Sequence, residues 1–241
     1  MNNLNLLKVY NFDKKKRLGN NGDGGYVIAE LDEPESHPKE TYDCYISAGV
    51  SDEESFSRDF INKYQLDKDN CYAFDGTIND YPWRYTNNIN FIKKNIGPIN
   101  DQWNDNLSTL FERYSNIFLK IDIEGGEYPW LLNDSLKLNN FKQIVIEFHG
   151  ITNHGWGTNY ADKVKCLEKL NDTHYIVHAH GNNHAHVTCL IPDVIELTYV
   201  NKNYFSLVPE LNKTPLPIPG IDYPNHHNRR DIDLNIFPFV N

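Results

Sequence analysis

The chain has 241 residues, of which 39% are apolar and 13% aromatic, enough to bury a substantial core in one large domain. Its 23 basic and 33 acidic residues give a formal charge of -10, which opposes binding to a phosphate backbone and argues against nucleic acid as a substrate. No apolar run approaches the roughly 20 residues that cross a bilayer, and residues 1–11 lack the pattern of a signal peptide. We therefore predict a soluble, intracellular, cytoplasmic protein with no membrane partner.

Apolar runs alternate with helical patterns along the chain. In order, the first half predicts a strand over 42–47, a helix opened by a capping box at 51–54, strands over 71–74 and 89–93, and a helix over 106–114. The second half predicts strands over 118–121 and 143–148, a helix over 160–170 and a strand over 175–178. Such alternation is typical of an α/β fold, a doubly wound and mainly parallel sheet with helices on both faces. We place this domain in residues 1–202.

Residues 203–241 form a separate compositional segment, rich in proline and asparagine. This composition predicts an irregular C-terminal extension that lies on or near the domain, or is partly mobile. The four cysteines, at 44, 71, 166 and 189, are far apart and form no C-x-x-C pair. They predict buried free thiols instead of a zinc site or a redox pair.

Two predicted strands end on polar side chains. Asp122 and Glu124 follow the strand over 118–121, and Glu147 and His149 close the strand over 143–148. The carboxyl ends of parallel strands line one edge of a doubly wound sheet, where open α/β folds carry out their chemistry. These four side chains are therefore expected to share one crevice with Gly49 and Asp75, which follow the first two strands.

The spacing of Gly49 and Asp75 suggests a nucleoside cofactor. A small residue after the first strand lets a ligand approach the backbone, and an acid after the second strand suits two ribose hydroxyls. The segment 49–54 lacks the second and third glycines of G-x-G-x-x-G and carries acids where a pyrophosphate would lie. A cationic ligand without phosphates fits better, and S-adenosylmethionine is the common one.

Three motifs occur in the order found in one known family. They are Ser-Ala-Gly-Val-Ser-Asp-Glu-Glu at 47–54, Ala-Phe-Asp-Gly-Thr at 73–77 and Lys-Ile-Asp-Ile-Glu-Gly at 120–125. With further segments between Arg17 and Tyr199, the chain resembles FkbM-like class I S-adenosylmethionine-dependent methyltransferases. One departure is Ser51, which stands where many relatives carry a second glycine. The resemblance implies the seven-stranded, Rossmann-like methyltransferase sheet and methyl transfer to a hydroxyl, often on a sugar or other small molecule.

Site roles follow from the strand ends and from the resemblance together. The predicted cofactor-binding residues are Ser47, Gly49, Val50, Ser51, Asp75, Gly76 and Asp122. The predicted catalytic residues are His149 as general base, Asp122 as the alternative base or an orienting group, and Glu124 for positioning the acceptor. Glu147, His180, Asn182 and Asn183 are predicted to contact a small-molecule or carbohydrate acceptor.

Two further interpretations of the histidines stay open. His178, His180, His184 and His186 would lie on one face if their segments paired as a hairpin across 181–183, and such a face either binds a metal or is a polar surface. Asp122, Glu147 and His149 are the better set for a divalent cation that holds a hydroxyl.

Two other classes of protein compete with the methyltransferase. One is an NAD-dependent oxidoreductase, which the missing glycines oppose. The other is a catalytically inactive methyltransferase fold that serves as a binding module. The sequence does not identify the acceptor, the oligomeric state or the metal dependence.

Overall fold

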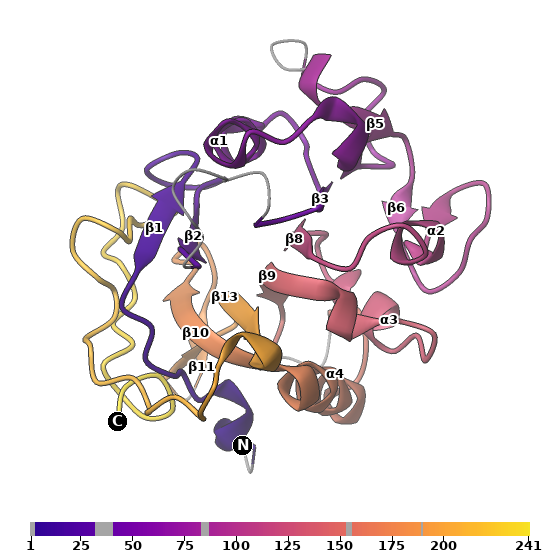
Figure 1. The fold of residues 1–241 in the computed structure, drawn as a ribbon. Coiled ribbons are helices and arrows are strands. Elements are labelled where there is room, and N and C mark those ends of the chain that lie inside the picture. Colours follow the sequence, from indigo (N-terminus) through magenta and orange to yellow (C-terminus); the bar gives the residue numbers. More distant parts are fainter. Residues whose placement is uncertain (1–2, 32–40, 83–86, 153–155, 189) are drawn as a thin grey trace.

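A seven-stranded sheet forms the centre of the molecule in the computed structural model, which describes residues 3–31, 41–82, 87–152, 156–188 and 190–241 (Figure 1). In spatial order its strands are β10 (His174–Gly181), β13 (Val194–Asn201), β9 (Phe141–His149), β8 (Ile117–Ile121), β3 (Cys44–Ala48), β4 (Cys71–Phe74) and β5 (Asn90–Ile92). Neighbouring strands are parallel except for β13, which runs antiparallel to β9 and β10. The predicted α/β fold with a mainly parallel, seven-stranded, doubly wound sheet is confirmed.

The central strands are buried on both faces, which explains their continuous apolar sequences. In β8 all five residues are buried, and alternate side chains point to opposite faces of the sheet. Ile117, Leu119 and Ile121 join one apolar core, while Phe118 joins the other. This alternation puts Lys120 and Asp122 on the face of Phe118 as the strand reaches the sheet edge.

Helices cover both faces of the sheet (Figure 1). The core on one face contains side chains of α1 (Ser55–Tyr64) and of the antiparallel pair β1 (Lys15–Leu18) and β2 (Tyr26–Ala29). The core on the other face contains side chains of α2 (Ser108–Phe111), α3 (Glu127–Leu131) and α4 (Tyr160–Thr173). The 3₁₀ helices are η1 (Leu4–Leu7), η3 (Lys68–Asn70), η5 (Leu138–Asn140) and η6 (Lys202–Tyr204), and the small pairs are β6 (Asn95–Ile96) with β7 (Asn104–Asp105) and β11 (Val187–Thr188) with β12 (Ile191–Pro192).

The predicted capping box at 51–54 is wrong. Ser51 has a left-handed backbone with φ of 50°, and its N–H donates to Asp75 at 2.9 Å. The helix begins only at Ser55, whose N–H donates to Oε1 of Glu53 at 2.5 Å. The helix predicted over 106–114 is also shorter than expected, because only α2 forms there.

The hairpin considered across residues 181–183, which would have put four histidines on one face, does not form. Residues 174–181 pair instead with β13, so that His180 lies opposite Glu196 and His178 opposite Thr198. The segment after the turn makes its own short pair, β11 with β12. His178 and His180 are therefore buried in the main sheet, and His184 and His186 do not share a strand face with them.

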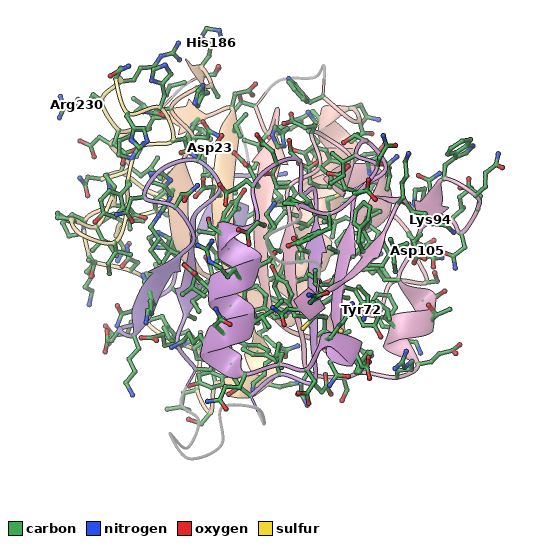
Figure 2. The ribbon with its side chains drawn as sticks, turned by 90° about the horizontal axis from the view of Figure 1, so that it is seen from above. Asp23, Tyr72, Lys94, Asp105, His186 and Arg230 are labelled. Carbon is green, nitrogen blue, oxygen red and sulfur yellow. The ribbon has the colours of Figure 1, made fainter. Side chains whose placement is uncertain are left out.

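The segment 203–241 lies against the N-terminal segment and the β10 side of the sheet. Tyr10 forms an isolated bridge with Leu211, and the N–H of Val9 donates to the carbonyl of Pro238 at 3.3 Å. Figure 2 shows Arg230 and His186 at the same corner of the molecule, where the neighbouring Arg229 donates to the carbonyl of His184 at 3.2 Å. The C-terminal segment thus closes one side of the domain.

Three cysteines, Cys44, Cys71 and Cys166, are buried free thiols, as predicted, and Cys189 lies outside the described residues. Burial raises the pKa of the Cys71 and Cys166 thiols to about 12, so neither is a reactive thiolate at neutral pH. Among the described helices, none has the length and apolar character needed to cross a membrane.

Candidate active site

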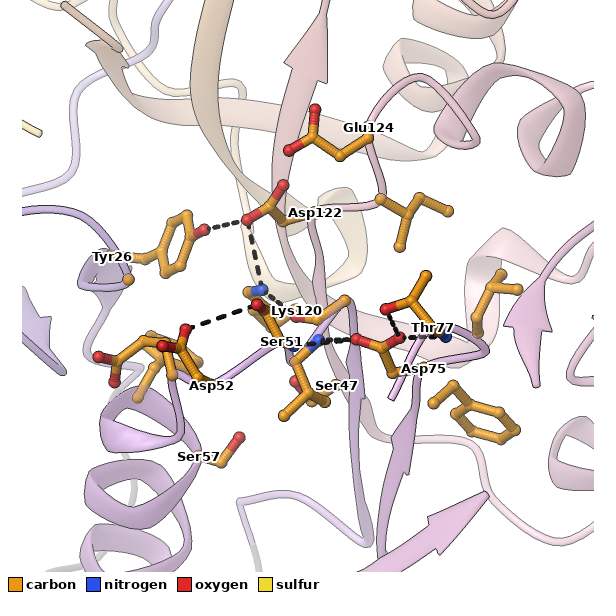
Figure 3. A pocket seen from close by; sticks show the side chains of 18 of the residues that line it. Tyr26, Ser47, Ser51, Asp52, Ser57, Asp75, Thr77, Lys120, Asp122 and Glu124 are labelled. Carbon is orange, nitrogen blue, oxygen red and sulfur yellow. Dashed lines mark hydrogen bonds and ion pairs between the residues drawn. The ribbon is translucent and has the colours of Figure 1, made fainter. Parts of the chain in front are cut away.

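A cavity of about 560 Å³ opens at the carboxyl ends of β3, β4 and β8 (Figure 3). Its lining carries six carboxylates and one ammonium group: Asp23, Asp52, Glu53, Asp75, Asp122, Glu124 and Lys120. The predicted cofactor residues Ser47, Gly49, Val50, Ser51, Asp75 and Asp122 also line it. Gly76 lies beside it, since its N–H donates to Asn95, another lining residue, at 3.2 Å.

Gly49 allows two loops of the site to touch. It has φ of +76°, and a Cβ added there would lie 1.6 Å from the backbone oxygen of Asp122. No side chain fits that space, so only glycine lets the loop after β3 lie against the loop after β8. The Nζ of Lys120 donates to the Gly49 carbonyl at 2.7 Å and holds the same contact.

Asp75 fixes the loop after β3 through both carboxylate oxygens. Its Oδ2 accepts from the N–H groups of Val50 and Ser51 at 2.9 Å each. Its Oδ1 accepts from the N–H and the hydroxyl of Thr77 at 2.7 and 2.5 Å. Burial opposes ionisation, but these hydrogen bonds outweigh it and lower the pKa of Asp75, so the carboxylate is charged at neutral pH.

Asp122 is held in place by two residues of the same wall (Figure 3). The hydroxyl of Tyr26 donates to its Oδ2 at 2.8 Å, and the Nζ of Lys120 lies 3.6 Å from the same oxygen. Burial raises the pKa of Asp122, yet Lys120, the Tyr26 hydrogen bond and His149 together lower it. Its other oxygen is left facing the imidazole of His149.

His149 is oriented by a buried carboxylate. Its Nδ1 lies 2.7 Å from Oε1 of Glu127, a residue with no exposed surface, at the start of α3. Its Nε2 lies 3.4 Å from Oε2 of Glu124 and 3.8 Å from Oδ1 of Asp122. Burial lowers the pKa of His149, but the hydrogen bond and charge of Glu127, with the charges of Asp122 and Glu124, raise it overall.

The arrangement also resembles a metal site. Ligand atoms of Asp122, Glu124 and His149 all lie within 4.8 Å of one another. Glu147, predicted as a ligand in place of Glu124, instead accepts from Nδ2 of Asn182 at 2.7 Å. Burial, with the charges of Asp122 and Glu196, raises the pKa of Glu147 well above its usual range, and a protonated acid is a poor ligand.

Comparison with known protein families identifies the family of this chain. Residues 11–186, well over half of the chain, match the model of the methyltransferase FkbM domain. The chain belongs to the FkbM methyltransferase family. No curated protein matches its sequence. The family predicted from the motif order is thus confirmed, and with it a methyltransferase.

In this FkbM-family methyltransferase, two predicted acceptor residues bind the C-terminal segment. Nδ1 of His180 lies 3.2 Å from Glu196, and its Nε2 lies 3.0 Å from Asp231. Nδ2 of Asn183 donates to the carbonyls of His226 and Arg229 at 3.1 and 3.2 Å. With Asn182 bound to Glu147, the structure ties all of these side chains to other protein groups.

Sequence reasoning gave no role to Tyr26, Lys120 or Glu127. A signal existed for Lys120, since a lysine inside an otherwise apolar buried strand requires partners for its charge. Glu127 lies two residues after the motif at 120–125, but its pairing with a histidine 22 residues later depends on how α3 sits against β9. No local pattern reports the contact between Tyr26 and Asp122.

Proposed function

We propose that this protein is an S-adenosylmethionine-dependent O-methyltransferase that acts on a hydroxyl of a small molecule or sugar. The observation that supports this most is the junction between the acidic cavity and His149. One imidazole nitrogen is bound by Glu127, while the other faces Asp122 and Glu124, which line the cavity. A donor in the cavity would therefore lie next to a general base.

The residues of the cavity fit a cationic donor better than a dinucleotide. Six carboxylates and one ammonium group favour the positive sulfonium and amino groups of S-adenosylmethionine and repel a pyrophosphate. The N–H groups of Val50 and Ser51, which a phosphate would need, already donate to Asp75. The cavity therefore offers the pyrophosphate of NAD neither a favourable charge nor free N–H groups at Val50 and Ser51.

The chemistry of the protein's own residues follows from these positions. When bound, the donor supplies an activated methyl group. Nε2 of His149 takes the proton of the acceptor hydroxyl, and Glu127 keeps the imidazole in the tautomer with the proton on Nδ1. Asp122 and Glu124 stabilise the imidazolium that forms, and Glu124, on the exposed side, holds the acceptor. The side chains thus orient the acceptor and move one proton.

Calorimetry with S-adenosylmethionine, S-adenosylhomocysteine and NADH tests the donor. We expect the first two to bind and NADH not to bind. Asp75→Ala should weaken donor binding by at least about tenfold, because the Asp75 carboxylate accepts the four hydrogen bonds that hold Val50, Ser51 and Thr77 in the wall of the cavity. Thr77→Val is the matched control, since it removes one bond to Asp75 and keeps the carboxylate. Binding of NADH alone would overturn the proposal.

A screen of methyl transfer against sugars, nucleotide sugars and glycans identifies the acceptor. Donor binding without turnover of any acceptor would favour the inactive binding module.

A metal-assisted form of the same reaction is the second candidate. Asp122, Glu124 and His149 would hold a divalent ion, and the cation would ease deprotonation of the acceptor hydroxyl. Activity would then vanish in EDTA and return with magnesium or manganese. Full activity in the chelator would leave His149 as the base.

A further inference from the structure

Trp156 lies beside the proposed base with part of its surface open. Its ring centroid is 5.4 Å from that of His149, with 31° between the ring planes, and 39% of the residue is exposed. His149 itself is 6% exposed. The indole thus covers the imidazole and still offers an aromatic surface to solvent next to the site.

The backbone around the indole is shaped to receive it. Gly125, Gly150 and Gly157 all have positive φ, at +92°, +65° and +64°. A Cβ on Gly150 would lie 2.4 Å from Cβ of Trp156, and one on Gly125 would lie 3.4 Å from the indole. Gly125 lies next to Glu124 in the loop after β8. Gly150 and Gly157 lie in the loop after β9, which ends at His149.

The position of the base limits where an acceptor can lie. Its hydroxyl must reach Nε2 of His149, which faces Asp122 and Glu124. The rest of the acceptor then meets the surface that adjoins this nitrogen. That surface includes the indole of Trp156 and the side chain of Glu124, which is 73% exposed.

We propose that Trp156 is the platform on which a pyranose ring of the acceptor stacks, with Glu124 accepting from a neighbouring hydroxyl. This rests on the proposed function and narrows its acceptor to a sugar. A pyranose presents a flat face of C–H groups and a rim of hydroxyls. An aromatic face beside a carboxylate matches both parts, and a binding site built this way combines apolar contact with a few oriented polar groups.

The test uses the full chain loaded with S-adenosylhomocysteine. Methyl pyranosides of common hexoses and deoxyhexoses are titrated by calorimetry, with catechol as a flat aromatic competitor. We expect at least one pyranoside to bind. Trp156→Leu should weaken that binding about tenfold, and Trp156→Phe should weaken it less, because the smaller ring still stacks. Trp103→Leu is the matched control, since Trp103 is 66% exposed and belongs to the loop between β6 and β7.

Several outcomes would overturn the platform. They are unchanged pyranoside affinity in both Trp156 variants, binding of catechol but no pyranoside, or no binding of either while S-adenosylhomocysteine binds. In turnover assays the platform predicts a raised KM for the acceptor. A loss confined to kcat, with a shifted pH profile, would show instead that Trp156 positions His149. Failure of S-adenosylhomocysteine to bind to wild-type protein would refute the cofactor proposal separately.

Discussion

Two buried histidines of this protein, His149 and His180, have similar surroundings but differ in the partners of their ring nitrogens. Each is flanked by carboxylates at the end of a sheet strand. His180 has a carboxylate on each nitrogen, from Glu196 and Asp231, and is 1% exposed. Among the described residues, the hydrogen-bond partner of the His149 ring is on Nδ1, while its Nε2 faces the carboxylates that line the cavity.

The difference in partners suits the two imidazoles to different roles under the proposed mechanism. Burial lowers the pKa of His180, but Glu196 and Asp231 outweigh it and raise the pKa to about 10, so this imidazole stays protonated. A cation locked between two acids cannot take a further proton. A histidine with one oriented and one available nitrogen can, which is what a general base needs.

The largest expected effect is the loss of turnover when His149 is replaced. His149→Ala should reduce kcat by about 10²- to 10⁴-fold, the usual contribution of general-base catalysis. Affinity for S-adenosylmethionine should remain nearly unchanged, because His149 is not among the residues that line the cavity. Single-turnover kinetics and calorimetry on one preparation measure both. Near-wild-type turnover would clear His149 of this role.

Replacement of His180 should instead lower the free energy of unfolding. His180→Gln leaves Glu196 and Asp231 without their cation, and breaking a buried pair in this way costs about 3–5 kcal/mol of unfolding free energy. Urea denaturation measures the loss. If His180 contacted the acceptor, as its sequence position suggested, the acceptor KM of the folded fraction would also rise.

The pH dependence of the unfolding free energy should distinguish the wild-type protein from His180→Gln. The pKa of His180 is raised on folding, so its stabilisation is complete below about pH 6.5 and is lost as the pH rises through about 10. Wild-type unfolding free energy should therefore fall over this range more steeply than that of His180→Gln. Parallel curves for the two proteins would contradict the pairing.

The smallest effect concerns the partner that orients the base. Only neutral His149 accepts a proton, so kcat/KM should rise with pH and level off above the pKa of His149, which lies above its ordinary value. Glu127→Gln removes the charge that raises this pKa, so the midpoint should move to lower pH. An unmoved midpoint would mean that another group controls the profile.

The fold was predictable because its signals are local. The apolar runs that become β8 and β9 end in polar residues, and parallel strands bring such ends to one edge, so Asp122, Glu124 and His149 could be placed together. The capping box failed because Ser51 donates to Asp75, a residue from the next strand. Local preference for a helix start gave way to a tertiary hydrogen bond.

The polar partners of the two histidines were not predictable, because they too depend on tertiary contacts. Glu127 meets His149 only because α3 starts where β8 ends, and Asp231 meets His180 only because the C-terminal segment returns across β10. Periodicity reports which face a side chain occupies and not which distant group it meets. The four residues predicted at the acceptor were assigned from strand ends and from the resemblance together. In the structure all four hydrogen-bond other protein groups.

The distance in sequence between His180 and Asp231 also sets an order of events during synthesis. Asp231 lies 51 residues after His180, and the ribosome adds roughly 5–20 residues per second, so the histidine waits about 3–10 s for its second acid. Until Asp231 is made, Glu196 is the acid that His180 can contact. The pairing of this imidazole with both acids is therefore completed late, and slower translation of residues 181–231 lengthens the wait.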